Sequence, residues 1–136
     1  RFTNADGTIP LSGSVVLDQL TGLMWARSAN LPGATKTWQQ ALDYVAGMNS
    51  SATYGYTDWR LPNLNELESL INAGAAGTAA WLTTQGFTAV QTNYYWTSTT
   101  NAASTGQVWV VNMHFGYLYF HDKANIHYVW PVRAGQ

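Results

Sequence analysis

With 136 residues, no cysteine and a formal net charge of −1, the chain is sized for a single domain, residues 1–136. The absence of cysteine excludes disulfides and thiolate metal sites, and the weak net charge gives no electrostatic footprint for nucleic acid. No apolar run reaches the roughly 20 residues that a membrane-spanning helix needs. Only 10% of the residues are charged, whereas seven are Trp and eight are Tyr, a composition typical of secreted or surface modules.

The chain opens with a predicted pair of strands. Residues 15–17 and 23–26 are apolar runs separated by a turn. In that turn, the Asp18 carboxylate can accept hydrogen bonds from backbone amides, and Gly22 can take the left-handed conformation that closes it. A metal-binding role for Asp18 is the alternative. We therefore expect a hairpin in which Asp18 and Gly22 are structural residues.

Two further segments carry helix signals. Thr37 and Gln40 form a capping box before an apolar face, which predicts a helix over residues 38–48. A stretch of small residues then precedes a predicted short helix over residues 78–84, which would bury Trp81.

The stretch over residues 56–67 is the most distinctive part of the sequence. Pro62 keeps the residue before it out of helical geometry, which sets a boundary. Asn63 and Glu66 then form a second capping box before an apolar face, so we expect a helix that ends near residue 72. Glu66 is therefore assigned to the helix cap.

Several buried or paired residues follow from these motifs. An arginine among apolar neighbours usually pairs with a carboxylate while its stem packs. Arg60 and Arg133 are therefore expected to be structural, with Asp58 and Asp43 as candidate partners. Five tryptophans are expected in the core, namely Trp25, Trp38, Trp59, Trp96 and Trp109.

From Tyr94 onward the pattern has a period of two, which predicts strands. One strand covers residues 94–99, and a surface loop over residues 101–106 follows it. Residues 108–114 and 117–122 form a hairpin, and residues 128–133 form a last strand. Helices between an early hairpin and a late antiparallel sheet predict an α+β domain.

The predicted hairpin carries the candidate site. A two-residue turn at positions 115–116 sets three pairs opposite each other, namely His114 with Tyr117, Asn112 with Tyr119, and Val110 with His121. Alternation gives a core face of Trp109, Val111, Met113, Leu118 and Phe120. The other face presents rings and hydrogen-bonding groups: Val110, Asn112, His114, Tyr117, Tyr119 and His121. Two interpretations stay open, a sheet surface stabilised by cross-strand pairs and a ligand or subunit face.

Other kinds of site have weaker support. The three histidines lack the spacing of a transition-metal site. Calcium is an alternative cofactor, with oxygens of Asp6 or Asp122 as ligands, although no run resembles a calcium loop. Glu66 and Glu68 lie on different faces of one helix, which does not suit a paired-carboxylate hydrolase. We therefore expect no metal site, no catalytic residue and no enzymatic activity.

Four motifs occur in an order that resembles a known family. They are Asp18…Thr21-Gly22-Leu23-Met24-Trp25, then Trp59-Arg60-Leu61-Pro62 with Glu66-Leu67, then Tyr95-Trp96-Thr97-Ser98-Thr99, and then Val129…Val132-Arg133. The set resembles the bacterial DUF1566 family, also named after the C-terminal domain of the Legionella collagen-like adhesin. The resemblance covers nearly the whole chain, and the Trp-Arg-Leu-Pro tract is its most specific part.

The resemblance implies a fold similar to C-type lectins and to the formylglycine-generating enzyme group, in which the first and last strands pair and two helices flank the sheet. The cysteine pair of that enzyme group is absent here. The resemblance also implies export, a cell-surface location and homo-oligomers, trimeric or larger. The Legionella protein binds glycosaminoglycans, a ligand that six Lys plus Arg residues without a basic cluster do not favour.

The sequence thus predicts a non-enzymatic extracellular adhesion or recognition module, which binds a neutral or weakly charged glycan through aromatic and amide side chains. The alternative is a structural subunit of a homo-oligomeric surface assembly or filament. Because the chain begins with Arg1 and not with Met, we expect a signal peptide or another domain before it.

Overall fold

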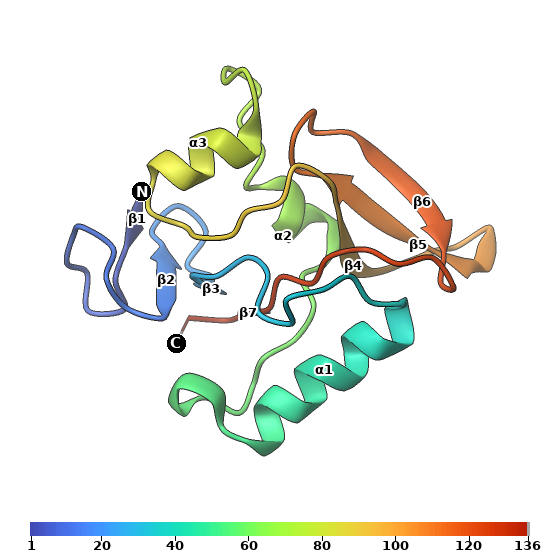
Figure 1. Ribbon diagram of the computed structural model, residues 1–136, viewed down its shortest axis with the longest axis horizontal. Helices are drawn as coiled ribbons and strands as arrows, with labels where there is room; N and C mark the ends of the chain where they lie inside the picture. Colours follow the sequence, from blue (N-terminus) through green and yellow to red (C-terminus); the bar gives the residue numbers. More distant parts are fainter. Residues whose placement is uncertain (136) are drawn as a thin grey trace.

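The computed structural model describes residues 1–135 and contains two antiparallel sheets (Figure 1). The first sheet has the order β1-β2-β3-β7, with β1 at Phe2–Thr3, β2 at Val15–Asp18, β3 at Met24–Ala26 and β7 at Val132–Arg133. The second has the order β4-β5-β6, with β4 at Tyr94–Asn101, β5 at Ser104–Asn112 and β6 at Leu118–Asp122. With three short α-helices, this is the α+β domain that the sequence predicts.

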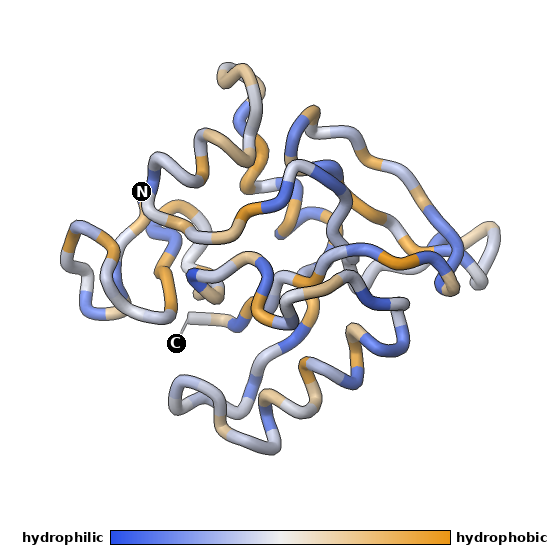
Figure 2. Tube along the Cα trace, in the orientation of Figure 1, coloured by the Kyte–Doolittle hydropathy of each residue, from blue (hydrophilic) through white to orange (hydrophobic). Residues whose placement is uncertain are grey.

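Two of the three helices begin where the predicted capping signals place them. In Figure 1, α1 (Trp38–Ser50) lies below the sheets and α3 (Thr78–Thr84) lies above β2 of the first sheet, with α2 (Leu64–Glu68) near the centre. Both predicted capping boxes are present. Hydrophobic and hydrophilic residues alternate along α1 (Figure 2), so that its apolar side packs inward. A short 3₁₀ helix, η1 (Thr53–Gly55), follows α1.

Helix α2 is shorter than predicted. It ends at Glu68, because the chain then tightens into bonds that span three residues, from the Leu70 amide to Leu67 and from the Ile71 amide to Glu68. Leu70 remains fully buried after the helix has ended. The apolar periodicity therefore continues beyond the regular helix.

Trp130 joins the two sheets into one core. Its ring lies 5.4 Å from Trp25 of β3 and 5.5 Å from Tyr95 of β4, and its indole N–H donates to the Ala26 carbonyl at 2.8 Å. All three rings are fully buried. The Trp25–Trp130 pair has the edge-to-face geometry that aromatic rings prefer, whereas the Tyr95 ring is tilted by 46° to Trp130.

The end of the chain differs from the expected strand over residues 128–133. The Tyr128 backbone pairs with β4 of the second sheet, whereas β7 pairs with β3 of the first. One continuous strand is not formed because this segment crosses from one sheet to the other. The expected pairing of the first and last strands is also wrong, since β1 and β7 lie at opposite edges of their sheet.

The expected surface loop over residues 101–106 is wrong as well. Asn101 pairs with Ser104, so β4 and β5 form a tight hairpin. Strand pairing continues here through small polar residues that carry no apolar alternation.

Candidate functional site

The loop between β5 and β6 is wider than the predicted two-residue turn. The side-chain oxygen of Asn112 accepts hydrogen bonds from the backbone amides of His114 and Phe115, each at 2.9 Å. Gly116 has a left-handed φ of +79°. The asparagine side chain therefore organises the turn from within. Because Asn112 is only 8% exposed, its assignment to a ligand face is wrong.

The wider loop moves the hairpin register by two residues. Tyr119 pairs with Val110, and His121 pairs with Val108. A shift of two keeps each side chain on its own face, so Tyr117, Tyr119 and His121 still lie on one face with their rings in sequence. Val110, which was expected on this face as part of an open surface, is fully buried.

Five rings on this face form a row that we call the aromatic stripe: Phe115, Tyr117, Tyr119, His121 and Tyr94. Phe115 and Tyr117 stack with ring centroids 5.2 Å apart, and Tyr119 lies 6.2 Å from Tyr117 and 6.3 Å from His121. Tyr94 of β4 meets His121 edge-on at 4.9 Å. Phe115, Tyr117 and Tyr119 are 63%, 52% and 51% exposed. Three neighbouring rings therefore face solvent.

Two members of the stripe were missed by sequence reasoning. Strand alternation omits Phe115 because it lies in the turn. Tyr94 comes from another strand, where it pairs with Asn112. Aligning the predicted strand over residues 94–99 beside the hairpin would have identified Tyr94, whereas the position of Phe115 depends on the Asn112 turn.

His114 does not extend the stripe. Its ring packs against Phe115 at 4.3 Å, and a Cβ atom at Gly77 would lie 3.0 Å from its Nδ1. The His114 carbonyl also accepts from the Thr78 amide at the start of α3. His114 therefore connects the hairpin tip to α3, and we assign it a structural role.

The other end of the stripe contains a histidine pair. The His121 Nδ1 and His127 Nε2 atoms are 2.8 Å apart. Burial and the neighbouring His121 lower the pKa of His127 to about 4. The His127 ring also lies 4.7 Å from Trp96, which is fully buried and donates its indole N–H to the Lys36 carbonyl.

The opposite face of the hairpin is only partly core. Val111 and Met113 are fully buried as predicted. Phe120 is 44% exposed and meets the half-buried Trp109 edge-on at 5.2 Å. β6 is an edge strand of its sheet, so the Phe120 ring lies beyond the core. Phe120 is thus wrongly predicted as a core residue.

The first predicted turn is confirmed. Asp18 is fully buried, and its carboxylate accepts from the Leu20 amide and from two nitrogens of Arg1. Burial alone would raise the pKa of Asp18, but the hydrogen bonds from Arg1 and Leu20 outweigh it and lower that pKa. Gly22 has a φ of +75°, and Trp25 is fully buried. Asp18 therefore stabilises the turn through an ion pair that the sequence pattern does not show.

The two arginines predicted to be structural pair with different carboxylates. Arg133 pairs with Asp58, as predicted, with 2.6 Å between Nε and Oδ1. Arg60 instead pairs with Glu66 through contacts of 2.6 and 2.7 Å. Glu66 also accepts from the Asn63 amide, so one carboxylate caps α2 and neutralises Arg60. The buried Pro62 lies between the two partners in the chain.

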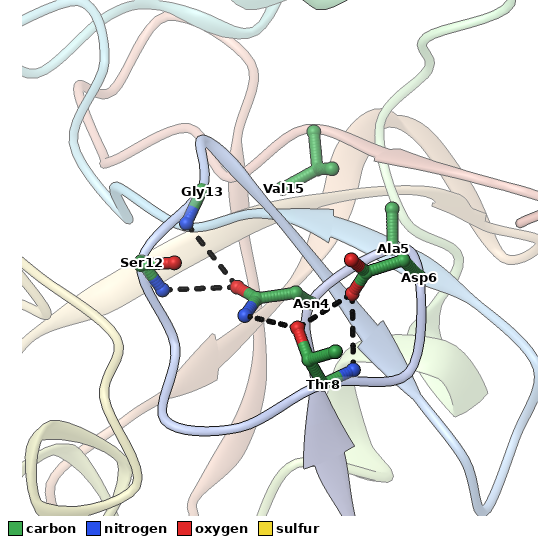
Figure 3. A pocket seen from close by; sticks show the side chains of 7 residues that line it. All are labelled: Asn4, Ala5, Asp6, Thr8, Ser12, Gly13 and Val15. Carbon is green, nitrogen blue, oxygen red and sulfur yellow. Dashed lines mark hydrogen bonds between the residues drawn. The ribbon is translucent and has the colours of Figure 1, made fainter.

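A shallow pocket in the N-terminal loop is lined by residues that bond mainly to one another (Figure 3). Asn4 accepts from the Ser12 and Gly13 amides and donates to Thr8. The Asp6 carboxylate accepts from the backbone and the hydroxyl of Thr8. These hydrogen bonds hold the loop together.

Two other features are absent from residues 1–135. No three His, Cys, Asp or Glu side chains in that part of the chain lie close enough together to hold a metal ion. No helix there is long and apolar enough to cross a membrane.

Comparison with known families identifies the chain. No curated protein matches it significantly. The family model described as the Lcl C-terminal domain matches residues 14–133. This range contains all four motifs on which the resemblance was based, and the family is related to surface adhesion. The chain therefore belongs to the Lcl C-terminal domain family.

Proposed function

We propose that this domain is a non-enzymatic recognition module of a secreted or surface-exposed adhesion protein, and that it binds a neutral glycan on the aromatic stripe. Membership of an adhesion-related family supports the setting. The observation that carries the proposal is the run of three exposed rings, Phe115, Tyr117 and Tyr119. Exposed apolar area of this kind on a folded domain usually marks a binding site.

The chemistry of the stripe suits a sugar ring. Tyrosine offers a flat apolar face that can stack on the C–H groups of a pyranose, and its hydroxyl can bond to the sugar hydroxyls. The stacked pair Phe115 and Tyr117 gives two such faces in adjacent positions. Because both rings lie on a hairpin anchored by the Asn112 turn, little conformational freedom is lost when a ligand binds.

The cations of the domain favour a neutral ligand. All four arginine side chains are engaged inside the domain, Arg1 with Asp18, Arg27 with the Gly86 carbonyl, Arg60 with Glu66 and Arg133 with Asp58. Lys123 lies over the Trp38 ring. A sulfated or carboxylated polymer would therefore find few available positive charges.

The test is a titration of the isolated domain with uncharged trisaccharides (chitotriose, maltotriose and cellotriose), in which NMR and calorimetry measure the binding. We expect the variant Tyr117→Ala with Tyr119→Ala to lose affinity by about tenfold or more while its Tm stays close to wild type. The matched control is Tyr54→Ala, which removes another exposed tyrosine outside the stripe and should bind normally. Equal affinity in the double variant and wild type would refute the site.

A second function is favoured by the position of Phe120. It places an exposed ring on the reverse face of β6, an edge strand, so that apolar surface flanks unpaired backbone on both sides. Such an edge is suited to contact with another copy of the chain. In this case light scattering without sugar should give a mass several times 15.0 kDa, and the double variant should return it to the monomer value.

A further inference from the structure

The histidine pair connects three segments at the end of the stripe. His121 lies on β6, and His127 lies beyond it in the chain, with 2.8 Å between His121 Nδ1 and His127 Nε2. The His127 backbone exchanges two hydrogen bonds with Lys36, at 2.8 and 2.9 Å. The pair therefore ties the strand that carries Tyr119 to the segment before α1.

Aromatic rings enclose the pair. Tyr94 lies 4.9 Å from His121 and 5.7 Å from His127, Trp96 lies 4.7 Å from His127, and Tyr119 stacks on His121 at 6.3 Å. A change in the charge or position of either imidazole would therefore act directly on two rings of the stripe, Tyr94 and Tyr119.

No ion pair within residues 1–135 joins either imidazole to a carboxylate. Three charged residues adjoin the pair through the chain or the backbone. Asp122 follows His121 and is exposed, Lys36 contacts His127 through backbone bonds, and Lys123 lies over Trp38 at 4.6 Å. Positive charge on the pair thus has no buried counter-ion.

Proton counting shows what acid does to this contact. In a neutral pair, one ring nitrogen donates to the other, and the remaining N–H points outward. A first extra proton can be added at an outward nitrogen, which leaves the shared hydrogen bond intact. A second proton puts an N–H on both facing nitrogens, so that two donors and two positive charges oppose each other.

We propose that the His121–His127 pair is a proton-sensitive latch on the aromatic stripe, closed at neutral pH and opened in acid by the second proton. Opening separates β6 from the segment that carries His127 and displaces Tyr119 and Tyr94. The consequence for ligand rests on the proposed function, because a displaced stripe holds a sugar less well. The domain would then retain its ligand at neutral pH and release it in acid.

The latch itself is tested without any sugar. Imidazole and tyrosine-ring resonances of the wild-type domain are followed by NMR from about pH 7.5 to about pH 3.5. We expect the Tyr119 ring resonances to move when the His127 imidazole takes up a proton in acid. A Tyr119 ring that does not respond to protonation of His127 would overturn the proposal.

A conservative variant separates the latch from general acid effects. His127→Gln keeps a hydrogen-bonding group beside His121 but cannot gain charge, so Tyr119 should no longer respond in acid. His114→Gln is the matched control, because it removes the histidine outside the pair, and its acid response should match wild type. If His127→Gln does not fold, His121→Gln provides the same comparison.

The binding arm uses the trisaccharide that binds most tightly of the three. Its affinity for wild type should fall by about tenfold between about pH 6.5 and about pH 3, and by less than about threefold for His127→Gln. Absence of binding at neutral pH would refute the proposed function while leaving the NMR test of the latch intact. Neutral-pH binding that persists unchanged in acid would refute the latch alone.

Discussion

Replacing Trp59 by alanine tests whether the motif over residues 56–67 is a core element. The side chain is 3% exposed, its indole N–H donates to the Thr53 carbonyl at 3.0 Å, and Tyr54 and Tyr56 meet it edge-on at 6.4 and 6.0 Å. The Trp59 backbone is held separately by the Asn49 side chain, at 2.7 and 2.8 Å. The substitution therefore removes side-chain packing while that backbone anchor remains.

The expected loss follows from these contacts. Large-to-small changes of a buried tryptophan cost about 3–5 kcal/mol, within which the lost hydrogen bond accounts for about 1 kcal/mol and each ring pair for roughly 0.5–1.5 kcal/mol. For a domain of this size we expect the Tm to fall by roughly 10–20 °C. Thermal unfolding followed by circular dichroism measures this fall.

The half-buried Trp81 of α3 provides a matched control, because it is a tryptophan with more exposed surface. Trp81→Ala should lower the Tm by clearly less than Trp59→Ala. A fall below about 3 °C for Trp59→Ala would refute the view that the motif is part of the core.

Three further predictions concern charge. Arg133→Lys loses the two-point contact with Asp58 and the stacking on Tyr56 at 3.9 Å, and should lower the free energy of unfolding by about 2 kcal/mol in urea titrations. The pKa of His127 is lowered to about 4 by burial and by His121. Below about pH 6.5, the usual pKa of a histidine, the unfolded chain therefore binds more protons than the folded domain. Stability should therefore fall by about 1–2 kcal/mol as the pH drops from about 6.5 to about 4, and His127→Gln should flatten that dependence in urea midpoints measured across this window. Trisaccharide affinity should change less than about twofold between about 0.05 and 0.5 M NaCl, and a steep loss measured by calorimetry would contradict stacking as the main interaction.

The sequence predicts best what depends on neighbouring residues. The capping boxes before α1 and α2, the bounds of α3 and the turn closed by Gly22 involve groups within a few positions of each other. Their hydrogen bonds satisfy the free amides of a helix start or tighten one turn. Such bonds form in the same way wherever the element is placed in the fold, so local pattern is sufficient.

Longer-range features were harder to predict, because several partners compete for the same group. Arg60 had carboxylates nearby in sequence, and it selects Glu66 because the first turn of α2 brings that side chain back toward it. Trp130 gave no signal of its role, since its contacts with Trp25 and Tyr95 exist only after both sheets have formed. The likeness to C-type lectins stays a prediction.

The candidate site could be predicted only in part. Period-two alternation placed Tyr117, Tyr119 and His121 on one face, and this survives an error of two residues in the register because the period itself is two. Asn112 was misplaced for a different reason, because its side chain bonds inside a turn that the sequence pattern did not predict. Phe115 belongs to the stripe because it lies in that turn. The hydrogen bonds of the Asn112 side chain therefore decide which rings face solvent.

The distribution of rings supports the proposal that the stripe is a functional surface. Trp25, Trp96 and Trp130 are fully buried and already fill the interior between the two sheets. Burying the exposed rings as well would stabilise the fold by roughly 1.5–3 kcal/mol for each one, yet the wide turn holds them beyond the core. Because only 10% of residues are charged, the domain has little electrostatic means of attracting a partner. Under the proposed function, recognition would therefore depend on stacking and hydrogen bonding at the stripe.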